Sequence, residues 1–373
     1  MTSHSSLLGA GLWVAAGALV VGAWLVLPLT HSYDVAEYQR YAAAALSPPW
    51  FTRWPREYPP LSLAVFLLPR LLPLPYPDAF AAVTAGAYLG LLWWVRRRLD
   101  LAAAWRLLGY TALGGGFVLE GRYDVVAAAV AALALAAVEG RRFGQAWAWA
   151  GAGFLVKLFP AAVAPVAALV EARQTRRLPW ARGGWTAAGV AAVVIGAGLR
   201  GGPGAWSWVG YFAGRPPEVG SVVGELAALA DPKHRIVFGF GSINVVSPWT
   251  APLGALLAGL AAAVVVGVLV QLWRGRIGPV TATLTILTAV LLGSKVFSVQ
   301  FLLWFLPWWS YYRFSPWWAG TAVASSLAYP FAYNWASAHP AWWNLDLGLL
   351  LARSILLAGG VWAVWRTPMA RRL

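Results

Sequence analysis

Apolar runs long enough to cross a bilayer constrain this chain more than any other feature of its sequence. Residues 7–29 and 250–272 each exceed the roughly 18 apolar residues that mark a candidate transmembrane helix. Of the 373 residues, 60% are hydrophobic and only 11% are charged, whereas a water-soluble domain needs more charge to cover its surface. The sequence therefore predicts an all-α, polytopic integral membrane protein of the cell membrane.

About twelve apolar segments follow one another, and we interpret residues 1–373 as a single transmembrane domain. The first segment is expected to be a retained helix and not a signal peptide, because it lacks preceding Lys or Arg residues and a following small-residue cleavage site. The segments are 7–29, 79–95, 101–119, 125–138, 144–157, 160–172, 184–199, 250–272, 278–293, 299–312, 316–331 and 347–365.

Some of these segments are too short to cross a membrane upright. Arginines flank residues 144–172 at both ends, which predicts a hairpin of two half-length helices that turns at Phe159-Pro160. Residues 61–73 are also short and contain Pro69 and Arg70. We expect them to form an interfacial helix that lies on the membrane.

The distribution of arginine predicts the orientation. With a cytoplasmic N-terminus, 16 arginines fall in or beside cytoplasmic connections, whereas the short outer connections hold only Arg122, Lys157 and Lys295. Cytoplasmic loops carry the excess of Lys and Arg in membrane proteins. Both termini are therefore predicted to be cytoplasmic, and the two long loops, 30–78 and 200–249, extracytoplasmic.

Several classes of function are excluded by what the sequence lacks. Without cysteine there are no disulfides, no thiolate catalysis and no Cys-based metal sites. Motifs of metalloproteases, serine hydrolases and P-loop proteins are absent as well. The net charge of +15 does not indicate nucleic acid as a partner, because the basic residues lie in short runs between apolar segments.

Polar residues of unusual placement gather on the predicted outer face. The first outer loop carries Asp34, Glu37 and Glu57 among many aromatic residues, although an ordinary solvated connector is the alternative interpretation. Cations at the outer ends of helices run against the topological preference, and ionisable groups at membrane depth are functional candidates by default. The alternative for each cation is a side chain that only reaches the outer headgroups.

Carboxylates facing cations beside a lipid phase suit one kind of chemistry. Arg and Lys donate charge-assisted hydrogen bonds to phosphate, and a carboxylate can take the proton of an attacking hydroxyl. A departing sugar-linked phosphate needs no protonation, so one base suffices, and a base opposite the leaving group gives inversion. We therefore expect group transfer from a lipid-linked phosphate donor to a hydroxyl. A divalent cation bridging Asp34 and that phosphate is compatible with the sequence, but no ligand cluster requires one.

Five short strings occur in an order that resembles known membrane glycosyltransferases of the GT-C superfamily. They are Tyr33-Asp34, Tyr58-Pro59-Pro60-Leu61, Gly121-Arg122-Tyr123-Asp124, Lys157-Leu158-Phe159-Pro160 and residues 294–300. The chain looks most like glycosyltransferase family 87, the polyprenyl-phosphate-mannose-dependent mannosyltransferases. It is also similar to the eukaryotic GPI mannosyltransferase I catalytic subunit.

The resemblance implies that Asp34 is the general base and that the donor is a polyprenyl-phosphate sugar, mannose, bound from the outer leaflet. The acceptor would be a hydroxyl of a lipid or glycan. Residues expected to bind the donor phosphate are Arg122, Lys157, Lys295, Arg215 and Gln300. Residues expected on the acceptor side are Glu37, Tyr38, Glu57, Tyr58 and Asp124.

The sequence departs from the family pattern in two strings, one of which has Tyr123-Asp124 in place of the more usual polar pair, and it leaves other functions open. Glu218 and Gly220 stand where the family carries Gln and Glu, so the sugar and the acceptor are not fixed, and related enzymes transfer arabinose. A transporter or flippase of a lipid-linked sugar is the main alternative, but the pseudo-symmetric halves it predicts are not visible. A non-enzymatic scaffold is the third class. Arg353, inside the last apolar segment, either pairs with Asp346 or faces a cavity.

Overall fold

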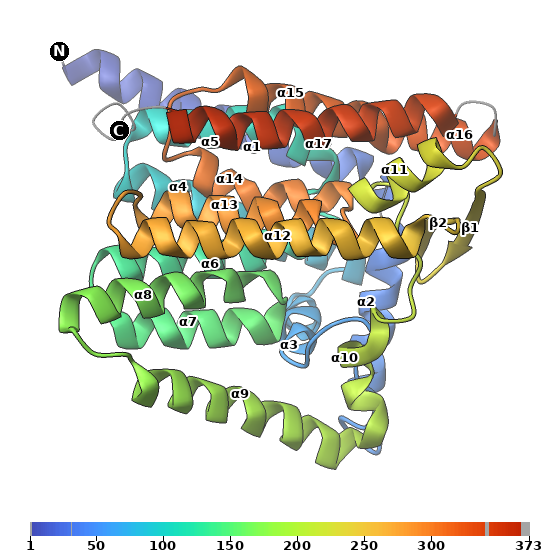
Figure 1. Cartoon of the computed structure of the whole chain (residues 1–373), viewed down its shortest axis with the longest axis horizontal. Helices are drawn as coiled ribbons and strands as arrows, with labels where there is room; N and C mark the ends of the chain where they lie inside the picture. Colours follow the sequence, from blue (N-terminus) through green and yellow to red (C-terminus); the bar gives the residue numbers. More distant parts are fainter. Residues whose placement is uncertain (1, 31, 340–342, 367–373) are drawn as a thin grey trace.

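The computed structural model describes residues 2–30, 32–339 and 343–366, and they form a bundle of helices (Figure 1). Helix accounts for 76% of the chain and strand for 3%, which confirms the prediction of a mostly helical protein. The structure departs from the all-α prediction at a two-stranded hairpin in the second long loop. Its strands are β1 (Arg235–Gly239) and β2 (Ser242–Val246).

Among the described residues, five helices are long and apolar enough to cross a membrane, which suggests a membrane protein. The other predicted crossings and the orientation stay predictions. The five helices are α1 (Thr2–Thr30), α4 (Tyr76–Arg98), α9 (Trp180–Gly201), α12 (Thr250–Trp273) and α17 (Trp343–Arg366).

Shorter apolar helices coincide with most of the remaining predicted segments. Among them α6 is almost entirely buried, because its many alanines let neighbouring helices approach closely. These helices are α5 (Leu101–Tyr110, continued to Val118 by tighter and wider turns), α6 (Asp124–Glu139), α7 (Phe143–Val156), α8 (Val163–Thr175), α13 (Pro279–Leu292), α14 (Leu302–Trp309), α15 (Pro316–Ser326) and α16 (Tyr333–Ala338).

The predicted pair of half-length helices is present as α7 and α8. A short turn, Phe159–Ala162, joins them, and Lys157 adopts extended backbone angles that end α7. The two helices fold tightly at this turn, since a Cβ at Gly153 would lie 2.5 Å from Pro160. Small size at Gly153 is therefore required for the turn.

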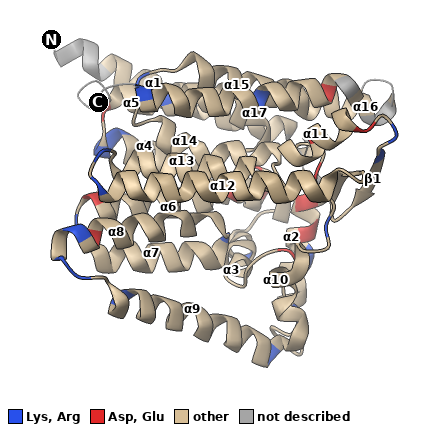
Figure 2. Ribbon diagram, in the orientation of Figure 1, with Lys and Arg blue, Asp and Glu red and all other residues tan. Residues whose placement is uncertain are grey.

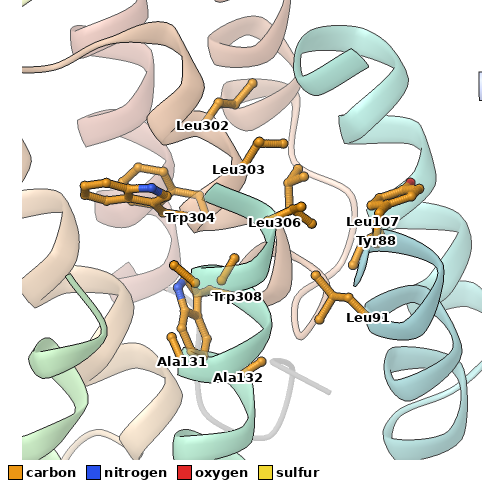
Figure 3. Packing of buried hydrophobic residues seen from close by; sticks show 14 of the residues in the cluster. Tyr88, Leu91, Leu107, Ala131, Ala132, Leu302, Leu303, Trp304, Leu306 and Trp308 are labelled. Carbon is orange, nitrogen blue, oxygen red and sulfur yellow. The ribbon is translucent and has the colours of Figure 1, made fainter. Parts of the chain in front are cut away.

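The core is built around α14, whose eight residues are all buried. A helix that is apolar on every side belongs inside a bundle. Figure 3 shows Leu306 turned toward Leu91 of α4, and Trp308 beside Ala131 of α6. Because α14 begins directly after residues 294–300, its packing fixes where that string lies.

The two long loops are largely structured. The first contains α2 (Ser32–Ala45), α3 (Ser62–Leu67) and a tight turn over Leu68–Leu71, so the expected interfacial segment is a short broken helix. The second contains α10 (Ser207–Tyr211) and α11 (Val222–Ala230) before the hairpin. The position of the segment 61–73 at the membrane surface stays a prediction.

The hairpin is held to the preceding chain by its backbone. The N–H of Val219 donates to the carbonyl of Ile243 at 3.0 Å, and the N–H of Val245 donates to that of Pro217 at 2.8 Å. The two turn residues, Phe240 and Gly241, have φ of 54° and 68°, the positive values of a type I′ turn. The segment 217–219 and the hairpin therefore form one unit.

Charge is distributed unequally between the two ends of the bundle. Figure 2 shows Lys and Arg at the end where α4 stops and α8 leads to α9, and carboxylates around α2 at the other end. By the bounds of the helices, the end of α4, the α6–α7 connection and the end of α8 with the residues after it carry Arg96, Arg97, Arg98, Arg141, Arg142, Arg173, Arg176 and Arg177. The cavity described next lies at the other end.

Candidate functional site

A cavity of about 530 Å³ lies between the two long loops and the ends of the core helices. Its walls come from nine separate stretches of the chain, which include α2, the hairpin and the start of α17. Nine of the eleven predicted site residues line it: Asp34, Glu37, Tyr38, Glu57, Tyr58, Arg122, Lys157, Arg215 and Gln300.

An ion pair between Asp34 and Arg122 stands in this cavity. Asp34 lies in the first turn of α2, where the partial positive charge of the helix N-terminus favours a carboxylate. Arg122 comes from the connection before α6, and its Nη1 contacts Oδ1 of Asp34. The side chains are only 21% and 15% exposed, so water screens the pair weakly.

A cluster of aromatic rings packs beside the Asp34–Arg122 ion pair. Tyr38 is 1% exposed and stacks on Phe66 with ring centroids 4.4 Å apart. The ring of Tyr123 meets Tyr38 edge to face at 5.7 Å and Tyr58 at 5.4 Å. Burial raises the pKa of Tyr38, so its hydroxyl is neutral near pH 7. The floor of the cavity is therefore rigid and uncharged.

Lys157 lies in a cage of aromatic rings and one carboxylate. Its Nζ donates to Asp124 Oδ2 at 2.7 Å and lies 4.4 Å from the centroid of the Tyr123 ring. The Nζ also lies 5.7 Å from the Phe301 centroid. Asp124 accepts a second hydrogen bond, 2.6 Å long, from Trp304 Nε1. The ammonium group is therefore fixed and mostly dehydrated.

Glu57 occupies the wall formed by the first loop. The hydroxyl of Tyr41 donates to Glu57 Oε2 at 2.7 Å. Burial raises the pKa of Glu57, and the Tyr41 hydrogen bond opposes that shift. Glu37 differs, because it is paired with Arg40 at the exposed side of α2.

Arg215 braces the second loop, and Glu218 ties that loop to the string that precedes α14. Arg215 is 6% exposed and donates through Nη2 to Ser242 Oγ at 2.5 Å, so it braces the hairpin. Ser298 donates to Oε1 of Glu218, and the N–H of Glu218 donates to the carbonyl of Lys295 at 2.8 Å. These contacts assemble one wall from two distant strings.

Two predicted site residues lie outside the lining. Asp124 is fully buried behind Lys157, so it supports the cation instead of facing an acceptor. Lys295 contributes its backbone to the wall, while its Nζ donates to the carbonyl of Ala213 at 3.3 Å. The sequence placed both in the right region but could not give the direction of their side chains.

The sequence interpretation considered Arg353 but missed its buried partners near Gly220. Arg353 is 1% exposed; it donates to the carbonyl of Gly220 and its Nη2 lies 3.8 Å from Glu225 Oε1. Asp346 lines the cavity, and neither of its oxygens has a hydrogen-bond partner among the described residues. Arg353 is therefore in contact with Glu225, a partner that the sequence interpretation did not consider.

Charges in the cavity nearly balance. Among the described residues of the lining, five carboxylates face four cations, and three of the cations already have partners. The cavity is therefore not a simple anion trap. The carboxylates are Asp34, Glu37, Glu57, Glu218 and Asp346, and the cations are Arg56, Arg122, Lys157 and Arg215.

Comparisons with known proteins do not add a family to this geometry. No family model matches the chain, and neither a curated protein nor a solved structure matches it. Within the part of the chain that the structure describes, no group of three or more Asp, Glu or His residues is placed to hold a metal ion. The fold and the cavity define a mostly helical protein that has helices of membrane-spanning length and a charged, aromatic-lined site, and function has to be argued from that site.

Proposed function

We propose that this protein is a membrane glycosyltransferase that moves a sugar, mannose, from a polyprenyl-phosphate donor to a hydroxyl acceptor, on the extracytoplasmic side. The observation that carries the proposal is the Asp34–Arg122 pair inside a cavity that also holds Lys157. A base and two phosphate-binding cations are thereby present within one weakly solvated space. The GT-C-like strings supply most of these residues, which supports the same proposal.

Asp34 is the general base of the proposed reaction. The acceptor oxygen attacks the anomeric carbon and forms a new C–O bond, while the bond from that carbon to the phosphate oxygen breaks. The proton of the acceptor hydroxyl passes to Asp34, and the electron pair leaves with polyprenyl phosphate. Attack opposite the leaving group inverts the anomeric centre.

Arg122 serves both reaction partners in this proposal. Its guanidinium has five N–H donors, so contact through Nη1 with Asp34 leaves donors for a phosphate oxygen. A bridging arginine orients the base and binds the leaving group at once. Such fixed donors stabilise the charge that develops on a departing phosphate.

Lys157 is the second phosphate-binding cation. One of its three N–H donors is used on Asp124, and the aromatic cage fixes the position of the others. The near balance of charge requires that some carboxylates be neutral when the phosphate binds. Burial raises the pKa of Glu57, which acts in this direction.

A turnover assay tests the proposal. Purified protein in lipid nanodiscs receives radiolabelled polyprenyl-phosphate-mannose and a lipid acceptor extract. Wild type should transfer label to a new product, and Asp34→Asn should lose transfer. Asp78→Asn is the matched control, because Asp78 is a carboxylate in the first turn of α4 that accepts a hydrogen bond from Trp24 outside the cavity.

The outcomes separate the candidate functions. Equal transfer by wild type and Asp34→Asn would remove Asp34 as the base. Donor binding without transfer, together with movement of the donor across a liposome bilayer, would favour the transporter or flippase instead.

A further inference from the structure

Three aromatic side chains form a wall of the cavity that the proposed reaction does not use. The rings of Tyr211 and Phe212 lie 5.3 Å apart at 85°, and those of Tyr211 and Phe240 lie 5.4 Å apart at 79°. All three residues line the cavity. They come from the end of α10, the residue that follows it and the tip of the hairpin, and Tyr211 is close enough to Glu57 to feel its charge.

Phe240 occupies a position where local preferences disfavour phenylalanine. Its φ of 54° lies in the left-handed region, where Asn, Asp or Gly is usual in a type I′ turn. The residue is also 42% exposed, and its ring contacts that of Tyr211 in the same wall. An aromatic ring held in such a conformation at the edge of a cavity indicates a ligand contact.

Polar groups border the aromatic wall. Arg215 and Ser242 lie at its base, joined by a hydrogen bond, and Arg56 and Glu57 line the cavity nearby. A hydrocarbon chain would form no hydrogen bond with these polar groups, and a phosphate would be repelled by the negative faces of the rings. A ligand that fits must present both an apolar face and a rim of hydrogen-bonding groups.

A pyranose ring has this division. Its C–H bonds point outward from the ring faces with partial positive charge, which attracts them to aromatic faces, while its hydroxyls lie around the edge. Carboxylates and guanidinium groups bind hydroxyls by hydrogen bonds. The wall and its border therefore match a sugar ring better than either a lipid chain or a phosphate.

We propose that Tyr211, Phe212 and Phe240 form a carbohydrate-stacking subsite that binds a pyranose of the acceptor. The acceptor is then a glycan or glycolipid and not a simple lipid alcohol. This inference rests on the proposed function for the word acceptor, whereas binding of the sugar ring can be tested without any transfer.

The test uses two amphiphiles that differ in the ring. Octyl α-mannopyranoside carries a pyranose, and 1-O-octylglycerol carries hydroxyls on the same alkyl chain without one. The variant is Phe240→Asn, because asparagine followed by Gly241 favours the existing turn and removes only the aromatic ring. Phe238→Ala is the control, since Phe238 lies on the same hairpin, is 73% exposed and is outside the lining.

Binding is measured by saturation-transfer NMR, without donor, on the full chain in nanodiscs. Wild type and Phe238→Ala should bind the mannoside equally and octylglycerol more weakly, and Phe240→Asn should bind the mannoside about five- to tenfold more weakly, the scale expected of one aromatic stack. In the turnover assay the same variant should raise the KM for the mannoside with little change in kcat or in the KM of the donor. Phe240→Trp, which keeps an aromatic ring at this position, should bind the mannoside about as strongly as wild type.

Other outcomes overturn the inference. Equal mannoside binding by Phe240→Asn and Phe238→Ala would remove the subsite, and so would equal binding of the two amphiphiles by wild type. If wild type transferred no sugar but bound the mannoside more tightly than octylglycerol, the glycosyltransferase proposal would be refuted. The sugar subsite would still be supported.

Discussion

Arg122 contacts Asp34 directly, although the two residues were predicted to serve opposite partners of the reaction. The contact couples the base to the cation that would bind the leaving group. Changes to either residue should therefore have dependent effects, since residues that act as one unit are far from additive.

The first prediction concerns this dependence. Arg122→Gln should lower turnover by at least about 100-fold, as loss of a positioned catalytic group does, and Asp34→Asn should have a similar effect. The double variant should be little worse than either single one. Initial rates of the three variants, measured at saturating donor, give the interaction energy.

The control for this prediction is Arg53→Gln. Arg53 is an exposed arginine of the first long loop, which also carries Asp34, and it lies outside the cavity lining. It should keep wild-type turnover. Fully additive losses in the double variant would show that Asp34 and Arg122 work independently.

The second prediction concerns the stability of the Lys157–Asp124 pair. Lys157→Met leaves the fully buried Asp124 without its cation, and removal of one partner of a buried pair costs about 3–5 kcal/mol of unfolding free energy. Adding Asp124→Leu should recover much of that loss, because the unpaired charge is then gone. Denaturant unfolding in detergent, followed by near-UV circular dichroism, measures both. A double variant no more stable than Lys157→Met would contradict the argument.

The third prediction is a pH dependence that arises at Glu225. Burial raises the pKa of Glu225 from 4.5 to about 8, and Arg353 acts in the opposite direction. The folded state therefore holds a proton that the unfolded state releases near pH 4.5. The resulting stability is complete below pH 4.5 and is lost as the pH rises to about 8.

Apparent Tm between pH 4.5 and 9 measures this effect. Glu225→Gln mimics the neutral carboxyl, so the fall in Tm with pH should be smaller in the variant than in wild type. Glu37→Gln serves as the comparison, because Glu37 forms only a partly exposed pair with Arg40. An identical pH profile for Glu225→Gln and wild type would exclude Glu225 as the source.

The fourth prediction concerns two glycines of α7. Gly153→Ala should lower Tm, because the added Cβ would lie 2.5 Å from Pro160, which must then move. Gly144→Ala, on the same helix with nothing within 4 Å, should be neutral or stabilising by up to about 1 kcal/mol through helix propensity. Thermal unfolding of the two variants side by side decides the point, and a harmless Gly153→Ala would show that the α7–α8 turn is loosely packed.

Features carried by local pattern could be predicted from the sequence. Apolar runs gave the helices, because burial of an apolar segment in a bilayer depends on composition alone. Asp34 and Lys157 stood out since charge is rare in such a chain. Both properties belong to short stretches, so no knowledge of distant contacts was needed.

Features that depend on distant partners could not be predicted. The contact of Arg353 with Glu225 joins residues far apart in the chain, and the sequence around either residue does not indicate the other as its partner. Asp124 was expected to face a substrate, but the rotation of α6 turns it behind Lys157. The hairpin was not predicted because its turn has Phe240 where Asn or Gly is usual, so the sequence lacks the common Asn-Gly pattern of a type I′ turn.

The shortness of α7 has a consequence for how a lipid could be used as substrate. At 14 residues α7 rises about 21 Å, whereas the hydrocarbon layer is about 30 Å thick. A helix of that length that starts at one membrane surface stops well below the other, so Lys157 would lie near the level of the acyl chains. A long-chain lipid could then present its headgroup sideways, with its tail still in the leaflet. Extraction from the bilayer, at about 0.8 kcal/mol for every CH₂, would not enter the activation barrier.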